Sequence, residues 1–189
     1  MHISFFCCTF TAATLDDQGK LTISGSGAMA DWMWSSETPW ADYLSSIKSL
    51  VINDGVTSLG TSAFENCTGL TSVTIPAGIT NIRTGAFYRC TSLTSVTIPN
   101  SVTSIGDLAF YGCTVLTSIT CEAVTPPACE RFCFYDVPKT IPLYVPKGSV
   151  EAYKDPSANG WKDFNNIQEI GVATAIDEIV NHNSSNRKS

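Results

Sequence analysis

The sequence LTSVTIP at residues 70–76 returns unchanged at residues 93–99, and the variant LTSITCE follows at residues 116–122. Other positions keep the same spacing of 23 residues, among them the pairs Ala63-Phe64, Ala86-Phe87 and Ala109-Phe110 and the cysteines Cys67, Cys90 and Cys113. A fixed period of this length is typical of solenoid proteins. One repeat is too short to bury its own apolar side chains, so neighbouring repeats must stack and share one core.

The repeated stretch has the pattern of a strand with one buried face. Val73 and Ile75 alternate with Ser72 and Thr74, and alternate side chains of a strand point to opposite faces of its sheet. Pro76 has no backbone N–H group, so we expect it to end the strand.

The rest of each repeat predicts a second extended segment and a short helical turn. Ile79 and Ile82 supply another inward-facing pair, and residues 86–90 follow as a helical turn that places Phe87 in the core. Each repeat is therefore predicted to form one turn of a coil, with a strand, a corner, an extended segment and a helical turn.

The strand pattern continues on both sides of the three clearest repeats. Segments at residues 21–23, 50–52, 73–75, 96–98, 119–121 and 143–145 share its register. We predict a β-rich solenoid with one parallel sheet of about six strands and short helical turns, capped at both ends.

The predicted organisation divides the chain into five parts. They are an N-terminal segment over residues 1–20, an N-terminal capping coil over 21–49, the 23-residue repeats over 50–140, a C-terminal cap over 141–171 and a flexible tail over 172–189. The ends of a solenoid expose its core and a strand edge, so terminal coils must differ from the repeats.

Aromatic side chains are predicted to seal both ends. At the front these are Trp32, Trp34, Trp40 and Tyr43, with a short helix over residues 39–44 that Thr38 would cap. At the back, Ser149 is expected to cap a helix that ends at Tyr153, and Trp161 and Phe164 provide apolar cover.

Residues 1–13 have two interpretations. Residues 3–10 are apolar and small residues follow, as in a secretory signal, but no Lys or Arg precedes them. The alternative is a segment that simply precedes the first strand at residue 21.

Charge and histidine content exclude several function classes. The net charge is −6 and the chain has no Lys/Arg cluster, which argues against nucleic acid and against an anionic membrane surface. No apolar run has the length of a transmembrane segment.

The only histidines, His2 and His182, lie near the chain ends, so no plausible base is available for a Ser-His or Cys-His catalytic pair. The sequence predicts no catalytic residue, metal or cofactor.

Six of the eight cysteines fall into two groups of three, and the other two are Cys7 and Cys8. Cys67, Cys90 and Cys113 occupy equivalent positions, and we expect them to stack as buried free thiols. Cys121, Cys129 and Cys133 are less regular, and Cys129 could pair with Cys133 or with Cys121. Without a nearby histidine, these three make a poor zinc site.

Two surfaces are candidates for binding. The outward strand positions form two hydroxyl columns, one of Ser49, Ser72, Ser95 and Ser118 and one of Thr74, Thr97 and Thr120. These residues are also good solvent-facing strand residues without any ligand. The second surface contains Tyr88, Arg89 and Tyr111, types that are common at interfaces. Here the alternative is that Tyr88 packs on Tyr111 between coils.

The repeat, with its Ile-Pro and Ala-Phe-x-x-Cys motifs, resembles the BspA type of leucine-rich repeat over roughly residues 21–170. The resemblance implies a right-handed solenoid at the surface of a cell or in secreted form, with a role in adhesion or protein recognition and no catalytic residues. Residues 125–133, with two prolines and two cysteines, depart from the regular repeat.

The predicted function is non-enzymatic protein recognition by a monomeric, secreted or surface protein, with extracellular or host proteins as partners. Two alternatives remain: a carbohydrate-binding module that uses Trp32 and Trp34, and a structural spacer within a larger surface protein.

Overall fold

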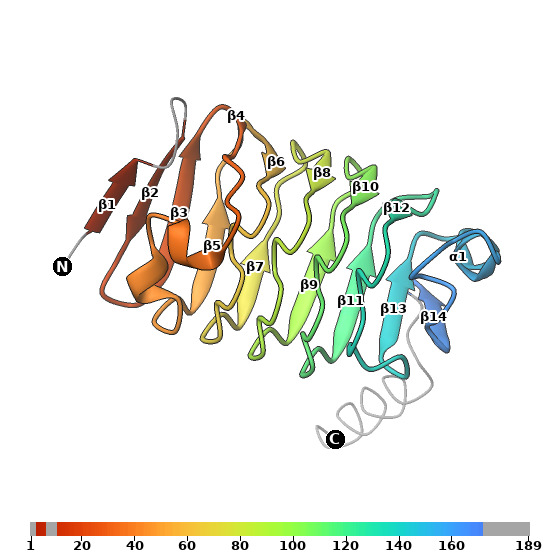
Figure 1. The fold of residues 1–189 in the computed structure, drawn as a ribbon. Helices are drawn as coiled ribbons and strands as arrows, with labels where there is room; N and C mark the ends of the chain where they lie inside the picture. Colours follow the sequence, from red (N-terminus) through yellow and green to blue (C-terminus); the bar gives the residue numbers. More distant parts are fainter. Residues whose placement is uncertain (1–2, 7–10, 172–189) are drawn as a thin grey trace, which may run out of the picture.

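The computed structural model describes residues 3–6 and 11–171, and its coils stack in chain order from one end of the molecule to the other (Figure 1). The predicted β-rich solenoid is confirmed. Each regular coil contributes one strand to a long sheet, one short strand to a second sheet and one turn segment that closes the coil. No helix among the described residues is long and apolar enough to cross a membrane.

Among the described residues, the long sheet has nine strands in the order β1-β2-β3-β5-β7-β9-β11-β13-β14. The six predicted strands are β3 (Lys20–Gly25), β5 (Ser49–Ile52), β7 (Ser72–Thr74), β9 (Ser95–Ile98), β11 (Ser118–Cys121) and β13 (Pro142–Val145). Neighbours among them are parallel and in the register of the repeat, so Ser72 pairs with Ser95 and Thr74 with Thr97. The further strand β14 (Asn166–Glu169) pairs in parallel with β13.

The N-terminal end differs from the prediction, which placed no strand before residue 21. Strands β1 (Ile3–Phe6) and β2 (Thr11–Leu15) extend the sheet in antiparallel fashion ahead of β3. The side chains of Ala13 and Leu15 are 0% and 3% exposed, because alternate residues of β2 face the core. Residues 1–2 and 7–10 lie outside the described residues, so the signal interpretation of residues 1–13 stays a prediction. The flexible tail predicted over residues 172–189 also lies outside them.

The second extended segments form a sheet of their own. Its five strands are β4 (Gly27–Ala28), β6 (Val56–Leu59), β8 (Asn81–Ile82), β10 (Ser104–Ile105) and β12 (Ala128–Cys129). All of its pairings are parallel. The prediction of a single sheet was therefore incomplete, although the inward-facing pairs such as Ile79 and Ile82 are buried as expected.

The turn segments of the regular coils are not helical, which corrects the prediction of short helical turns. In the coil of Phe87, the backbone N–H groups of Gly85, Phe87 and Arg89 donate to carbonyls of the next coil at 2.7–2.9 Å. The N–H groups between them donate back within their own coil, as Ala86 does to Arg83. This alternation bonds the coils through a third ladder, beside the two sheets, that a helix would not provide.

Left-handed backbone at repeated positions produces this alternation. The first such position holds Ser62, Gly85 and Leu108, with φ of 52°, 62° and 58°. Arg89 and Gly112 occupy a second position, with φ of 55° and 72°. A side chain is disfavoured in this region, so contacts with the adjacent coil must hold the non-glycine residues there.

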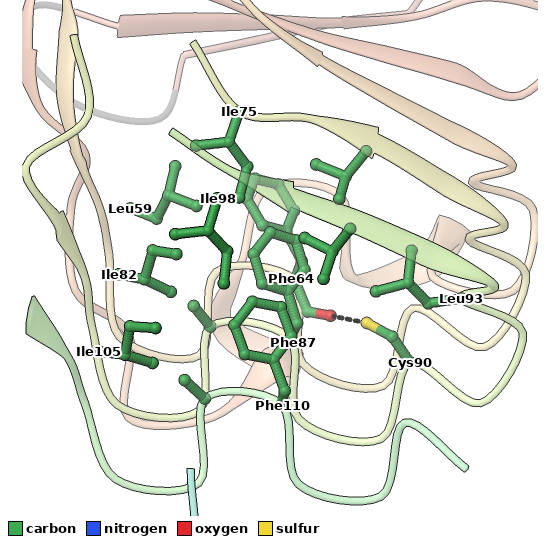
Figure 2. Packing of buried hydrophobic residues seen from close by; sticks show 14 of the residues in the cluster. Leu59, Phe64, Ile75, Ile82, Phe87, Cys90, Leu93, Ile98, Ile105 and Phe110 are labelled. Atoms are coloured by element: carbon green, nitrogen blue, oxygen red, sulfur yellow. Dashed lines mark hydrogen bonds between the residues drawn. The ribbon is translucent and has the colours of Figure 1, made fainter. Parts of the chain in front are cut away.

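The core is one continuous cluster that runs through all coils. Phe64, Phe87 and Phe110 stack along its axis with ring centroids 5.5 and 5.3 Å apart, and each ring is fully buried (Figure 2). Leu59, Ile82 and Ile105 form a parallel row from the second sheet, as Figure 2 shows. The same interior thus repeats from one coil to the next, as the period predicts.

Both ends are sealed by aromatic side chains. Trp40 is buried, stacks on Phe64 at 5.7 Å and donates its indole N–H to the Ala63 carbonyl at 2.9 Å. At the other end, Trp161 lies 4.9 Å from Phe134, and its indole donates to the Pro127 carbonyl at 2.8 Å. Both indoles therefore complete the core while satisfying their only polar group.

Local details of the caps differ from the prediction. The front cap contains two 3₁₀ helices, Ser35–Glu37 and Ala41–Tyr43, and the Thr38 hydroxyl donates to the Ser35 carbonyl at 2.8 Å and does not cap a following helix. Helix α1 (Val150–Lys154) forms at the back as expected. Ser149 precedes it with helical φ and ψ of −95° and −9° and makes no side-chain cap, because a capping side chain needs an extended backbone.

Candidate functional site

The outer face of the long sheet carries the two predicted hydroxyl columns in register. Strand pairing aligns Ser49, Ser72, Ser95 and Ser118 in one column, and Val51, Thr74, Thr97 and Thr120 in the other. Neighbours in a column are about 4.8 Å apart and the columns about 6.7 Å apart, as strand geometry requires. We call Ser72, Thr74, Ser95, Thr97, Ser118 and Thr120 the hydroxyl face.

Hydroxyl groups beside this face are used differently. Thr71, Thr94 and Thr117 each donate to a carbonyl of the preceding coil, at 3.0–3.1 Å. Thr80 and Thr103 do the same on the second sheet, both at 3.2 Å. These bonds connect the coils, and we call the five residues the stapling threonines. Sequence reasoning did not distinguish them from the hydroxyl face, because both sets are Ser or Thr at outward-facing positions of the same repeat.

Within the described part of the chain, the side chains of the hydroxyl face make no hydrogen bond. Ser72, Thr74, Ser95 and Thr97 are exposed, and Ser118 and Thr120 are half-buried. The face contains no ionisable group. Its hydrogen-bond donors and acceptors can therefore bind a partner without attraction or repulsion by a charge on the face. A rigid sheet holds them in place, which lowers the entropy lost when a partner binds.

A second surface lies on the turn segments, where tyrosines stack from coil to coil. Tyr88 and Tyr111 have ring centroids 5.0 Å apart, and Tyr111 and Tyr135 are 5.1 Å apart. The expected contact between Tyr88 and Tyr111 is thus present. Tyr135 was not among the predicted residues, since an extra residue in the last coil shifts it from the period. The recurring motif of an aromatic pair, Phe87-Tyr88, Phe110-Tyr111 and Phe134-Tyr135, was the signal for it.

The faces of this tyrosine stack are covered. The Arg89 guanidinium lies 5.5 Å from the Tyr88 ring centroid, and Phe132 packs edge-on against Tyr135 at 5.6 Å. Burial raises the pKa of the Tyr111 hydroxyl, and the neighbouring Asp136 carboxylate raises it further. Tyr88 and Tyr111 are half-buried and Tyr135 is exposed, so this surface suits contact with a protein better than stacking on a sugar ring.

The front tryptophans mostly serve the core. Trp40 is buried, and Trp32 packs on it edge-on at 5.4 Å. Trp34 differs, because 59% of its surface is exposed, and the neighbouring Met33 is 72% exposed. A sugar-stacking site would therefore have the single ring of Trp34.

The cysteine ladder is buried and unpaired, as expected for structural thiols. Cys67, Cys90 and Cys113 are free and fully buried. Cys90 donates to the Phe64 carbonyl at 3.2 Å, drawn as a dashed line in Figure 2, and Cys113 donates to the Phe87 carbonyl at 3.3 Å. Burial raises the pKa of Cys67 and of Cys113 to about 12. Because they are also closed off from solvent, these thiols are inert at neutral pH.

No metal site was found in the part of the chain that the structure describes, where no group of three or more His, Cys, Asp or Glu side chains has suitable geometry. The ion pairs there are few: Asp16 with Lys20, Glu151 with Lys154, and Asp31 with Arg83. Asp31 also accepts the backbone N–H of Thr61 at 2.7 Å, so this pair joins three coils. The Asp31–Arg83 pair therefore holds stacked coils together.

A family model described as BspA type leucine-rich repeat region matches residues 41–155 in 6 copies. The chain belongs to this family. The match covers the regular coils and parts of both caps. No curated protein matches the chain.

Two solved structures share the fold. A leucine-rich repeat protein from Eubacterium ventriosum aligns with a TM-score of 0.61 and 23% identity over 79% of this chain and 45% of its own. The pneumococcal vaccine antigen PcpA aligns with a TM-score of 0.56 and 16% identity over 82% of this chain and 45% of its own. The chain therefore spans less than half the length of these two proteins, and identities this low establish the fold alone.

Proposed function

We propose that this chain is a non-enzymatic protein-recognition module of a secreted or surface protein, and that it binds an extracellular or host protein through the hydroxyl face. One observation carries the proposal: the hydroxyl groups of this face have no partner among the described residues, whereas the stapling threonines of the same coils do. Ser and Thr suit solvent-facing strand positions with or without a ligand, so a binding measurement decides whether these hydroxyls are used.

The location rests on similarity. The family is one of bacterial repeat proteins, and one structure with the same fold is described as a vaccine antigen. A secreted or surface location, adhesion as the biological role and a monomeric state are parts of the proposal. Tyr88, Arg89 and Tyr111 form the second binding candidate, on the turn segments of the same coils.

A charge substitution tests the hydroxyl face. The variant Thr74→Arg/Thr97→Arg places two guanidinium groups on an uncharged surface, and a partner would have to desolvate them. The control Thr91→Arg/Thr114→Arg makes the same change at two exposed, equivalent positions of the turn segments. Binding is measured against a panel of purified extracellular-matrix proteins. We expect at least one of them to bind the natural protein and the control, and to bind the test variant about tenfold or more weakly.

Two results would contradict the proposal. If the natural protein binds none of the panel, adhesion to matrix proteins is wrong. If both variants lose binding equally, the partner does not use the hydroxyl face. Circular dichroism of each variant checks that its fold is unchanged.

The exposed ring of Trp34 supports carbohydrate binding as a second candidate. Exposed tryptophans stack on sugar rings, and a single ring would give weak binding. Glycan-array binding that is lost with Trp34→Ala and kept with Thr74→Arg/Thr97→Arg would favour it. The spacer alternative predicts that neither proteins nor glycans bind.

A further inference from the structure

Three cysteines meet in the irregular coil that follows the regular repeats. Cys121 lies on β11, Cys129 on β12 and Cys133 in the next turn segment. The side chains of Cys129 and Cys133 line the same pocket. A Cβ atom at Gly160 would lie 2.7 Å from the Cys133 sulfur and 3.4 Å from the Cys129 sulfur. Both sulfur atoms therefore face the same point of the C-terminal cap.

Cys121 is held in a different environment. It is fully buried, and the Tyr153 hydroxyl lies 3.1 Å from its sulfur while donating to the Ala123 carbonyl at 2.7 Å. Cys129 is half-buried and lines a pocket of about 390 Å³ that Lys139 and Asp163 also line. A molecule in solvent can thus reach Cys129, while Cys121 is enclosed by the cap.

The cysteines of the regular coils provide an internal contrast. Cys90 and Cys113 each donate to a carbonyl of the preceding coil and are fully buried. Stacked, parallel side chains also fit the torsion of a disulfide poorly. Of the six cysteines in the described ranges, Cys129 and Cys133 are the two whose sulfur atoms lie near one point, beside Gly160, and line the same pocket.

We propose that Cys129 and Cys133 form a redox site that closes to an intramolecular disulfide when the protein meets a small disulfide oxidant such as oxidised glutathione. The Cys129 thiolate attacks one sulfur of the oxidant, which forms a mixed disulfide and releases one thiol. The Cys133 thiolate then attacks the Cys129 sulfur and releases the second thiol. Two electrons pass from the cysteines to the oxidant, and the two cysteine protons end on the released thiols.

The Cys129–Cys133 disulfide forms slowly, and its role is to stabilise the last coil. Burial raises the pKa of the Cys129 thiol, and the nearby Cys133 adds to this effect, so the reactive thiolate is scarce at neutral pH. The disulfide ties β12 to the segment that carries Phe132 and Tyr135, which are 50% and 49% exposed. Phe132 has a φ of 60°, a strained value for a large side chain, and the covalent link holds this end of the tyrosine stack in place.

Peptide mapping of the whole chain tests the site, because glutamates separate the cysteines. Cleavage after Glu122, Glu130 and Glu151 gives one peptide over residues 123–130 that contains only Cys129, and one over residues 131–151 that contains only Cys133. The reduced protein is incubated with oxidised glutathione at mildly alkaline pH, unfolded in an alkylating reagent and digested. We expect the two peptides to be joined and about 2 Da lighter than their sum, and to separate on reduction. Peptide 66–122 should carry four alkylated cysteines.

Either of two results overturns the proposal: both peptides alkylated and separate, or peptide 123–130 joined to peptide 66–122 through Cys121. A second variant keeps the test sharp. In Cys133→Ser the first step can occur without the second, so one glutathione should remain on peptide 123–130. If the glutathione is found on peptide 66–122 in its place, Cys129 is not the sulfur that solvent reaches. If this variant fails to fold, the digest of the natural protein still decides whether Cys129 and Cys133 form the disulfide.

Discussion

Two aromatic stacks run side by side through the turn segments, one inside the molecule and one outside. The inner stack of Phe64, Phe87, Phe110 and Phe134 has centroid separations of 5.3–5.5 Å, and the outer stack of Tyr88, Tyr111 and Tyr135 has separations of 5.0–5.1 Å. The ring geometry is thus nearly the same, but the phenylalanines are buried and Tyr135 is 49% exposed. The comparison teaches that removal from water, more than stacking distance, decides what a ring contributes to stability.

Truncation of a ring from the inner stack should have the largest effect. We expect Phe87→Ala to lower the free energy of unfolding by about 3–5 kcal/mol, because it leaves a cavity in the middle of the core. Urea denaturation measures this change. The control Phe87→Leu keeps most of the volume and should cost less than about 1.5 kcal/mol. A loss below about 1 kcal/mol for Phe87→Ala would show that Phe87 does not support the core.

The buried thiols beside the inner stack predict a loss of stability at alkaline pH. Burial raises the pKa of Cys67 and of Cys113 from 9.0 to about 12. The unfolded chain releases these protons above pH 9 while the folded protein keeps them, so the free energy of unfolding falls as the pH rises from about 9 to about 12. Each thiol contributes a slope of about 1.4 kcal/mol per pH unit in this window.

Urea denaturation at several pH values in that window measures the slope, and Cys67→Ala and Cys113→Ala should each reduce it. An unchanged slope in both variants would mean that other groups, such as tyrosines, cause the loss.

Truncation of the outer stack should have the smallest effect of the three. Tyr88→Ala removes one ring contact, with Tyr111, and we expect it to lower the free energy of unfolding by about 0.5–1.5 kcal/mol. Phe87 and Tyr88 are neighbours in the chain, so the two alanine variants compare the inside and outside of one coil directly. Tyr88→Phe keeps the ring and serves as the control. Equal losses for Phe87→Ala and Tyr88→Ala would mean that burial does not distinguish the two stacks.

The sequence predicted those parts of the fold that depend on the repeat. A spacing of 23 residues identified the equivalent strands, the inner phenylalanines and the buried cysteines, because each coil places equivalent residues one above another. It also aligned the hydroxyl columns of Ser72 and Thr74 with those of the next coil.

Features that depend on contacts between coils were harder to predict. Residues 86–90 have a spacing that suits a helical turn, but the left-handed conformation of Gly85 and Arg89 turns alternate N–H groups toward the next coil. Strands β1 and β2 were missed because they belong to no repeat. The different hydrogen bonding of Thr94 and Thr97 also left no trace in the sequence, since it depends on which carbonyl lies opposite each hydroxyl.

The third ladder of backbone hydrogen bonds has a consequence for how such a molecule can grow. The backbone hydrogen bonds of every regular coil join it to the coil before it and the coil after it, through two sheets and one turn segment at once. Duplication of one whole repeat would add a coil that forms the same three connections to its neighbours. It would lengthen the solenoid by about 4.8 Å. An insertion of any other length would have to be accommodated between two connections, as the extra residue between β11 and β12 is in the last coil.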